Sequence, residues 1–335
     1  MRFIKANFPA DKSDAAIKVI EDAKPVSWNV TEGYSKSGKL VEIVVGKGDG
    51  QDLIDNLQDL LEGEEDWRIV VMPIEATLPR PEEIKVEEDK KEEKKPDKNT
   101  ALREELYQKV EGDCCLNADF LILTVLSAIV AAIGLNHDNV AIVIAAMVIA
   151  PLLGPVLAFA LAAALGDLSL MRKAGQTALA GLIVGFVFAA GLSQFMSVDL
   201  NSQELLSRTV INPAIIALAL ASGAAAALSL STGISSALVG VMVAVALLPP
   251  AVASALFLGA GEYHHSLAAA VLLCLNVICA LLSAQLIFVY KGVRPRKWRS
   301  QKKAATSVKI NAVVWITLLI GLATLAYKLN LQEAL

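Results

Sequence analysis

The first 80 residues alternate between short strand-like runs and two longer runs with helical periodicity. Residues 2–8 (RFIKANF) alternate apolar and polar positions, and residues 13–23 (SDAAIKVIEDA) have helical spacing behind the N-cap candidate Ser13. Two strand-like runs, an amphipathic helix (DGQDLIDNLQDLLEG) and a last strand follow. We therefore expect the order strand, helix, strand, strand, helix, strand over residues 1–80. This is the order of a ferredoxin-like or ligand-sensing ACT-like module, a fold that hosts many functions.

The pattern then changes twice before the long apolar segments begin. Residues 81–100 are dominated by Lys and Glu, too charged to bury a core, so we expect a disordered or loosely helical linker. Residues 101–116 regain helical spacing and predict a short amphipathic helix before the membrane. In this prediction the linker makes residues 1–80 a tethered α+β domain rather than part of the membrane bundle.

Seven apolar segments follow, and each has the length of about 20 residues that a bilayer core of about 30 Å requires. The predicted fold class is an α-helical polytopic membrane protein with about seven transmembrane helices and an N-terminal cytoplasmic domain. The segments cover approximately residues 117–135, 139–165, 175–196, 212–230, 234–260, 266–290 and 307–327. The second and fifth segments are longer than one straight crossing needs, which predicts interrupted or strongly tilted helices.

An internal repeat relates the second segment to the fifth. Residues 146–155 read AMVIAPLLGP and residues 241–250 read VMVAVALLPP, 95 positions later. The same shift aligns further residues: Asn117 with Asn212, Ser127 with Ser222, Met147 with Met242, Pro155 with Pro250, and Gly166–Asp167 with Gly261–Glu262. We interpret this as two three-helix copies (117–196 and 212–290), joined by an outward loop (197–211) and followed by a basic loop (291–306) and a last helix (307–335). Because three is odd, the copies should cross the membrane in opposite directions.

Helices broken at matching positions of inverted repeats point to the midplane site of a secondary transporter. A break frees backbone groups that lipid cannot satisfy but a solute, an ion or water can. The candidate pathway residues are therefore Pro151, Gly154, Pro155, Pro249 and Pro250, with the polar residues Asn117, Asn139, Ser222 and Asn276. The alternative also stands: prolines often only kink membrane helices, and a neighbouring helix can satisfy the amide of Asn276.

Charge sets the orientation and excludes several classes of function. The chain is 55% hydrophobic, and residues 1–116 hold 18 Lys/Arg and 27 Asp/Glu against 12 and 7 in residues 117–335. With the N-terminus in the cytoplasm, the basic residues next to the spans face inward, except Arg208 and Lys328, as the positive-inside rule requires. The C-terminus is then outside. Residues 1–12 have no apolar core of a secretory signal.

No catalytic or cofactor motif accompanies these spans. The four cysteines lack a metal-ligand spacing, the pair His264–His265 has no third ligand, and GKGDG at 46–50 is a turn rather than a phosphate-binding loop. We therefore expect no enzyme, no cofactor, no metal and no nucleic-acid partner. The expected partners are the lipid bilayer, a small solute or ion, and further copies of the chain in a homo-oligomer of unknown number. GLIVG at 181–185 and the small residues of the fourth segment predict close helix packing.

Two stretches resemble a known family. NVAIVIAAMVIAPLLGPVLAFALAAALGDLSLMRKA and the later LVGVMVAVALLPPAVASALFLGAGE are similar to the signatures of the bacterial and archaeal membrane family called domain of unknown function 389. The resemblance covers about residues 115–260 and implies a prokaryotic inner-membrane protein, without a substrate or a catalytic residue. Two functions stay open: a transporter or channel for a small solute or ion, gated by its cytoplasmic domain, and a non-transporting scaffold or sensor whose soluble domain binds a ligand or partner.

Overall fold

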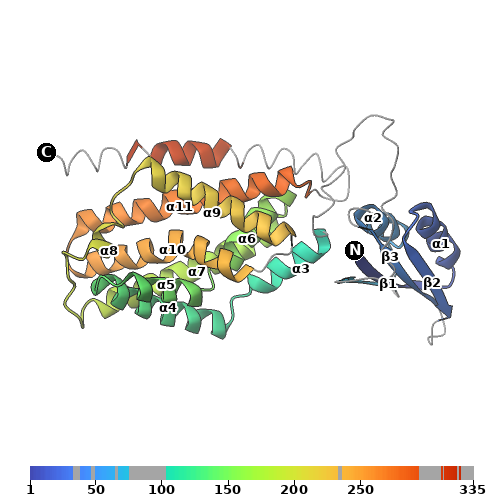
Figure 1. Ribbon diagram of the computed structural model, residues 1–335, viewed down its shortest axis with the longest axis horizontal. Helices are drawn as coiled ribbons and strands as arrows, with labels where there is room; N and C mark the ends of the chain where they lie inside the picture. Colours follow the sequence, from blue (N-terminus) through green and yellow to red (C-terminus); the bar gives the residue numbers. More distant parts are fainter. Residues whose placement is uncertain are drawn as a thin grey trace. The chain divides into compact units, whose positions relative to one another are not determined.

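The computed structural model describes residues 1–32, 38–46, 50–64, 67–74, 103–232, 236–293, 311, 313–322 and 324–325. The predicted linker and most of the predicted basic loop lie outside these ranges. The chain divides into two compact units, Met1–Glu105 and Leu106–Leu335, which are described separately (Figure 1).

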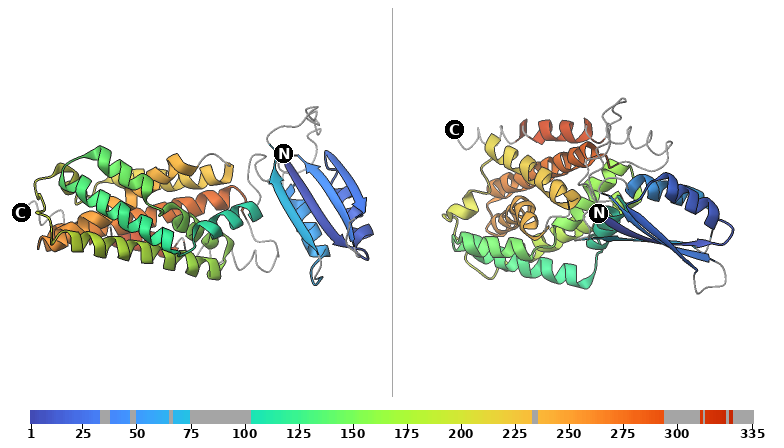
Figure 2. Two further views of the ribbon diagram at one scale, coloured as in Figure 1. Left: turned by 90° about the horizontal axis from the view of Figure 1, so that it is seen from below. Right: turned by 45° about the vertical axis from the view of Figure 1, so that its right-hand side comes forward.

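The first unit is a four-stranded antiparallel sheet with two helices. Its elements are β1 (Arg2–Pro9), α1 (Ser13–Asp22), β2 (Ser27–Glu32), β3 (Gly38–Val45), α2 (Gly50–Leu60) and β4 (Arg68–Pro73). The strand order is β2-β3-β1-β4, so the predicted sequence of elements is confirmed. Figure 2 shows both helices on one face of the sheet.

The alternation seen in the sequence places the core of this unit between the sheet and the two helices. Ile4, Ala6 and Phe8 of β1 are fully buried, while the residues between them are partly exposed. They pack in one cluster with Ile20 of α1 and Leu57 of α2. Every second residue of the strand is buried, which fixes the register of the sheet. The buried residues of α1 and α2 recur at helical spacing, which fixes the faces that these helices turn to the sheet.

Residues beyond the predicted linker also belong to the first unit. The backbone N–H of Arg103 donates to Gln51 Oε1 at 3.0 Å, and its guanidinium donates to Asp55 at 2.8 Å. Arg2 and Glu105 form a further ion pair at 2.8 Å. Burial raises the pKa of Asp55 above its usual value, although the neighbouring Arg103 guanidinium acts to lower it. The first unit therefore includes residues on both sides of residues 81–100, and it reaches past the predicted boundary at residue 80.

The second unit is helical. Its helices are the later part of α3 (Arg103–Asp113), then α4 (Ala118–Asn136), α5 (Val140–Ile149), α6 (Leu153–Leu165), α7 (Leu168–Leu192), α8 (Gln203–Leu206), α9 (Pro213–Thr232), α10 (Ser236–Gly259) and α11 (Tyr263–Tyr290). Within the described ranges, α4, α7, α9 and α11 are long and apolar enough to cross a membrane, and α5 with α6 makes a fifth if the bent pair is one span. A shorter apolar helix covers Val313–Leu322. Several apolar helices of spanning length are thus present, as a membrane protein requires.

The small residues predicted to permit close packing do so within the chain. A Cβ on Gly181 of α7 would lie 2.9 Å from the ring of Phe120 in α4, and one on Gly185 would meet Thr124 at 3.6 Å. Gly223 of α9 likewise leaves no room for a side chain against Ala280 of α11. These faces are therefore occupied by neighbouring helices of the same chain.

The stretch between the second and third predicted segments, residues 166–174, was expected to be a loop but is mostly helical. Helix α7 begins at Leu168, so Arg172 and Lys173 lie in its first turns rather than between two helices. Gly166 ends α6 at φ 70°, and the carboxylate of Asp167 accepts hydrogen bonds from the backbone N–H groups of Ser169 and Leu170. This cap starts α7 before residue 175, where the predicted segment began. The apolar pattern missed this start because Arg172 and Lys173 interrupt it.

Candidate functional site

The second predicted span is broken at Ala150–Leu152. Helix α5 ends at Ile149, α6 begins at Leu153, and the two are bent by 57°. Ala150 is extended, with φ −64° and ψ 120°. Pro151 explains both observations, because its ring excludes the helical conformation from the preceding residue and clashes with the carbonyl one turn back.

The break leaves backbone groups without helical partners. The carbonyl of Ala146 still accepts from the N–H of Ala150 at 3.1 Å, and that of Leu152 accepts from Val156 at 3.5 Å. The carbonyl of Met147 loses its partner because Pro151 has no N–H, and the helix ends before the carbonyls of Val148 and Ile149 are paired. Three carbonyl oxygens therefore remain at the end of α5.

The start of α6 tolerates its proline and needs its glycine. Pro155 lies in the first turn, where no intrahelical partner is available to any N–H. A Cβ on Gly154 would lie 2.7 Å from both Cβ and the carbonyl oxygen of Asp113, the last residue of α3. Gly154 thus lets the first turn of α6 approach the end of α3, and it brings a carboxylate-bearing residue to that turn.

Helix α3 and the segment after it pack beside the break. Thr177 Oγ1 of α7 donates to the carbonyl of Cys114 at 2.8 Å, and a Cβ on Gly181 would lie 3.4 Å from Leu152. Tyr107 of α3 donates to Asp167 Oδ2 at 3.0 Å. Burial, with the hydrogen bond to Asp167, raises the pKa of Tyr107 to about 12, so the phenol stays a donor at neutral pH.

The second proline pair lies inside an unbroken helix. Helix α10 continues through Pro249 and Pro250, so the interruption expected for the fifth predicted span is absent. Pro250 has no N–H for the carbonyl of Ala246, one turn earlier. Asn276 Nδ2 of α11 donates to this carbonyl at 2.8 Å, and both residues are buried. A neighbouring helix thus satisfies both the amide and the freed carbonyl.

The other predicted pathway residues do not gather at the prolines. Asn117 is the exposed N-cap of α4 and accepts from the N–H of Phe120, and Asn139 is the exposed N-cap of α5 and accepts from the N–H of Ile142. Ser222 is buried in α9, where its hydroxyl donates to the carbonyl of Ala219. These three residues have local roles in helix structure.

Three further residues stand out in the fold: Asp113, Ser127 and Gln285. Asp113 could not be linked to Gly154 from the sequence, because 40 residues separate them and the contact needs the folded chain. Ser127 is fully buried in α4, and its hydroxyl has no hydrogen-bond partner among the residues that the structure describes. Its one sequence signal is its alignment with Ser222 in the repeat. Gln285 of α11 is a second buried side chain without a partner in that part of the chain.

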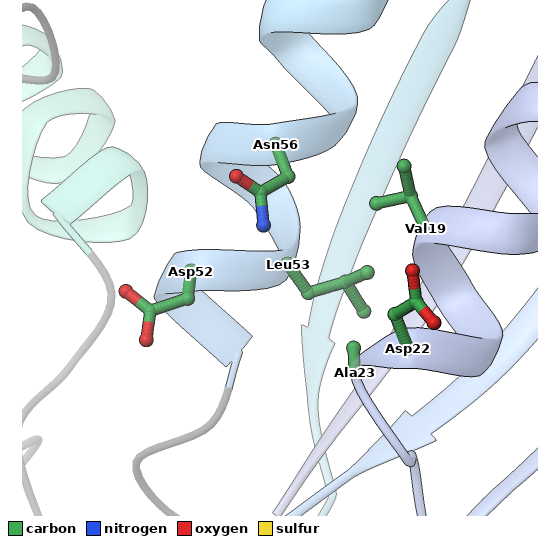
Figure 3. A pocket seen from close by; sticks show the side chains of 6 residues that line it. All are labelled: Val19, Asp22, Ala23, Asp52, Leu53 and Asn56. Carbon is green, nitrogen blue, oxygen red and sulfur yellow. The ribbon is translucent and has the colours of Figure 1, made fainter.

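The first unit holds a hollow of about 280 Å³ between α1 and α2. Figure 3 shows its lining residues, with Leu53 in the middle and the carboxylate of Asp52 pointing away from that of Asp22. The two carboxylates therefore do not converge on one point. Within the described residues no group of three or more His, Cys, Asp or Glu side chains could hold a metal ion.

Comparison with known proteins identifies the family of this chain. The family model described as "Domain of unknown function (DUF389)" matches residues 147–282. An uncharacterized protein of Methanocaldococcus jannaschii is 32% identical over 326 residues, which cover 97% of this chain and 98% of the relative. The chain belongs to the DUF389 family. The part of it that matches the DUF389 model begins at Met147 and includes the break, both proline pairs and Asn276. No solved structure matches.

Proposed function

We propose that this DUF389 protein is a membrane transporter or channel for a small solute or ion, with its pathway at the break between α5 and α6. The observation that carries the proposal is the set of three carbonyls freed at Met147–Ile149 within an apolar helical unit. Unpaired backbone at membrane depth is tolerated where it lines a cavity or meets a ligand. Discontinuous helices of transporters place such carbonyls at ion and substrate sites.

Matching local structure supports an inverted repeat of three helices plus one. Asn212 caps α9 as Asn117 caps α4, each accepting from the N–H three residues later. Gly166 and Gly261 both end helices at positive φ. The N–H groups of Asp167 and Glu262 donate to carbonyls five residues earlier, each at 2.9 Å.

A tertiary contact follows the same shift. Gly185 approaches Ala128 between the first and third helices of one copy, and Ala280 approaches Gly223 in the other. With three helices in each copy, residues 172 and 263 should lie on opposite sides of the membrane. Labelling of single cysteines at these positions with an impermeant reagent tests this, and modification of both from one side contradicts it.

The orientation and setting are part of the proposal. The proposal is a prokaryotic inner-membrane protein with seven spans and a first unit that regulates the pathway, and the positive-inside rule supports a cytoplasmic N-terminus. A homo-oligomer stays a prediction, because the small-residue faces that favoured one are occupied within the chain.

Reconstitution of the full chain into liposomes tests transport. Osmotic swelling in a panel of small neutral solutes and salts should be faster than in protein-free liposomes. Pro151→Ala should slow it, because an alanine at this position permits the helix to close over the freed carbonyls. Swelling equal to that of empty liposomes for every solute, with folded protein inserted, would exclude a passive pathway.

One observation favours the alternative, a non-transporting scaffold or sensor. The carbonyl freed by Pro250 is already paired with Asn276, so this carbonyl needs no solute. In that function the first unit binds a ligand or partner, and the hollow between α1 and α2 is where a ligand would fit. Pro151→Ala would then leave membrane permeability unchanged.

A further inference from the structure

We propose that the break between α5 and α6 binds a small monovalent cation of the sodium and potassium class. Its ligands are the carbonyl oxygens of Met147, Val148 and Ile149 and the hydroxyl of Ser127. The inference rests on the proposed function, since it names the class of ion that visits the same break.

The packing register of α4 and α5 brings Ser127 to the break. The two helices form an antiparallel hairpin in which a Cβ on Gly134 would meet Val143 at 2.9 Å. Ser127 lies seven residues before Gly134 in α4, and Ala150 lies seven residues after Val143 in α5. Both separations are about 10 Å along the helix axis. Ser127 and Ala150 therefore lie at the same level, and Ser127 is on the face of α4 that carries Gly134.

The unpaired hydroxyl of Ser127 is an independent sign of a ligand. It is fully buried and has no partner in the described part of the chain, although a serine in a helix can usually donate to a carbonyl one turn earlier. Its counterpart Ser222 does make such a bond, with the carbonyl of Ala219 at 2.9 Å. A buried polar group left without a partner costs free energy, which a bound ion at the break would offset.

The chemistry of the break favours a cation. Carbonyl oxygens at a helix C-terminus carry the negative end of the helix dipole, and a hydroxyl adds a fourth oxygen. The opposing first turn of α6 has N–H groups that attract anions, but Asp113 lies against it at Gly154. The carboxylate of Asp113 would repel an anion and add attraction for a cation.

The number of charges favours a monovalent ion over a divalent one. Proteins hold Ca²⁺ and Mg²⁺ with carboxylates, several of them for tight binding. The proposed ligands at the break are all neutral, and Asp113 is exposed at its edge. Neutral carbonyl and hydroxyl oxygens suit an ion of single charge that enters and leaves readily.

Thermal unfolding of the purified full chain in detergent tests the site. NaCl or KCl replaces choline chloride at constant ionic strength and constant chloride. The midpoint should rise with Na⁺ or K⁺, as expected for a ligand that binds the folded state. Ser127→Ala should be as stable as the wild type in choline chloride but should bind the cation roughly tenfold more weakly.

Ser222→Ala is the matched control, because it removes the equivalent hydroxyl of the other copy and should leave the cation response unchanged. A midpoint that responds equally to Na⁺, K⁺ and choline in the wild type would overturn the proposal. An undiminished cation response in Ser127→Ala would also overturn it. So would a rise produced by choline sulfate or choline phosphate alone, since it would assign the break to an anion.

A flux measurement separates this inference from the proposed function. Swelling that depends on the protein but proceeds equally in choline, Na⁺ and K⁺ salts, unaffected by Ser127→Ala, would retain the pathway and reject the cation site. A cation-dependent midpoint lost in Ser127→Ala, without any flux, would retain the site and reject transport.

Discussion

Helix α10 and the pair α5–α6 contain prolines at equivalent positions, yet only one of them is broken. Pro155 and Pro250 correspond, but Pro155 lies in the first turn of a new helix and Pro250 in the interior of a continuous one. Two proline positions differ: Pro151 lies in the break where α10 has Ala246, and Pro249 of α10 stands where α6 has Gly154. The break therefore depends on Pro151 rather than on the proline that both copies share.

The helices that neighbour the two proline sites also differ, because only one of them has a donor side chain at the matching position. Asn276 of α11 pairs with the carbonyl that Pro250 frees, whereas the equivalent residue in α7 is Gly181, which has no donor side chain. A proline in a membrane helix is thus compatible with continuity when another helix supplies the missing donor. Where the neighbouring helix supplies no donor, the freed carbonyls remain available to water, a solute or an ion.

Ala246→Pro should have the largest effect, because it copies Pro151 into α10. It removes an N–H from a helix interior and introduces a steric clash, at a cost of about 3 kcal/mol or more. Thermal unfolding in detergent should show a strongly lowered midpoint or no folded protein. A stable variant would mean that the difference between the two helices has another origin.

Asn276→Leu tests whether the hydrogen bond from α11 stabilises the proline-containing helix α10. It leaves the carbonyl of Ala246 buried without a partner, which should cost about 1–3 kcal/mol. The measurement is the free energy of unfolding from a titration with denaturing detergent. Ser222→Ala, which removes a local hydrogen bond, is the control and should cost less than about 1 kcal/mol. Equal losses in the two variants would argue against a special role for Asn276.

Gly154→Ala sharpens the account of how α6 begins. The new Cβ would lie 2.7 Å from Asp113, so α3 or α6 must shift, with an expected cost of about 1–3 kcal/mol. Gly191→Ala in α7 meets nothing within 4 Å and should be neutral or stabilising by about 0.5–1 kcal/mol. The sign of the change should therefore differ between the two variants, and a stabilising Gly154→Ala would contradict the contact.

Asn117→Ala and Asn212→Ala should have the smallest effects, and equal ones. Each removes an N-cap bond, at 2.8 and 3.0 Å, from the first helix of its copy. A loss of about 1 kcal/mol is expected for each. Clearly unequal changes in unfolding free energy would weaken the structural equivalence of the two copies.

Sequence pattern predicted the elements better than the contacts. The alternation of Ile4, Ala6 and Phe8 was enough to place a buried strand, because burial on a sheet follows a period of two. The apolar runs predicted helices of spanning length for the same kind of reason. The return of Arg103 to Asp55 was not predictable, since an ion pair across a charged linker has no local signature.

The candidate site illustrates the same limit. The prolines identified both helices, but local sequence treats Pro151 and Pro250 alike. Whether the carbonyl freed by Pro250 has a partner depends on Asn276, which lies 26 residues beyond Pro250 and on another helix. Ser127 and Ser222 stand at matching positions of the repeat, and the sequence does not distinguish them. The fold gives Ser222 a hydrogen-bond partner and leaves Ser127 without one among the described residues.

The most direct test of the central claim compares water access at Ala150, in the break, with water access at Ala246, which is buried in the continuous helix α10. Each is replaced by cysteine in a chain whose four native cysteines are changed to serine or alanine, and the folded protein is treated with a small hydrophilic thiol reagent. We predict that Ala150→Cys is modified, because the break meets water and ions, and that Ala246→Cys is protected. Protection of both positions would contradict the account, because neither water nor an ion would then reach the break.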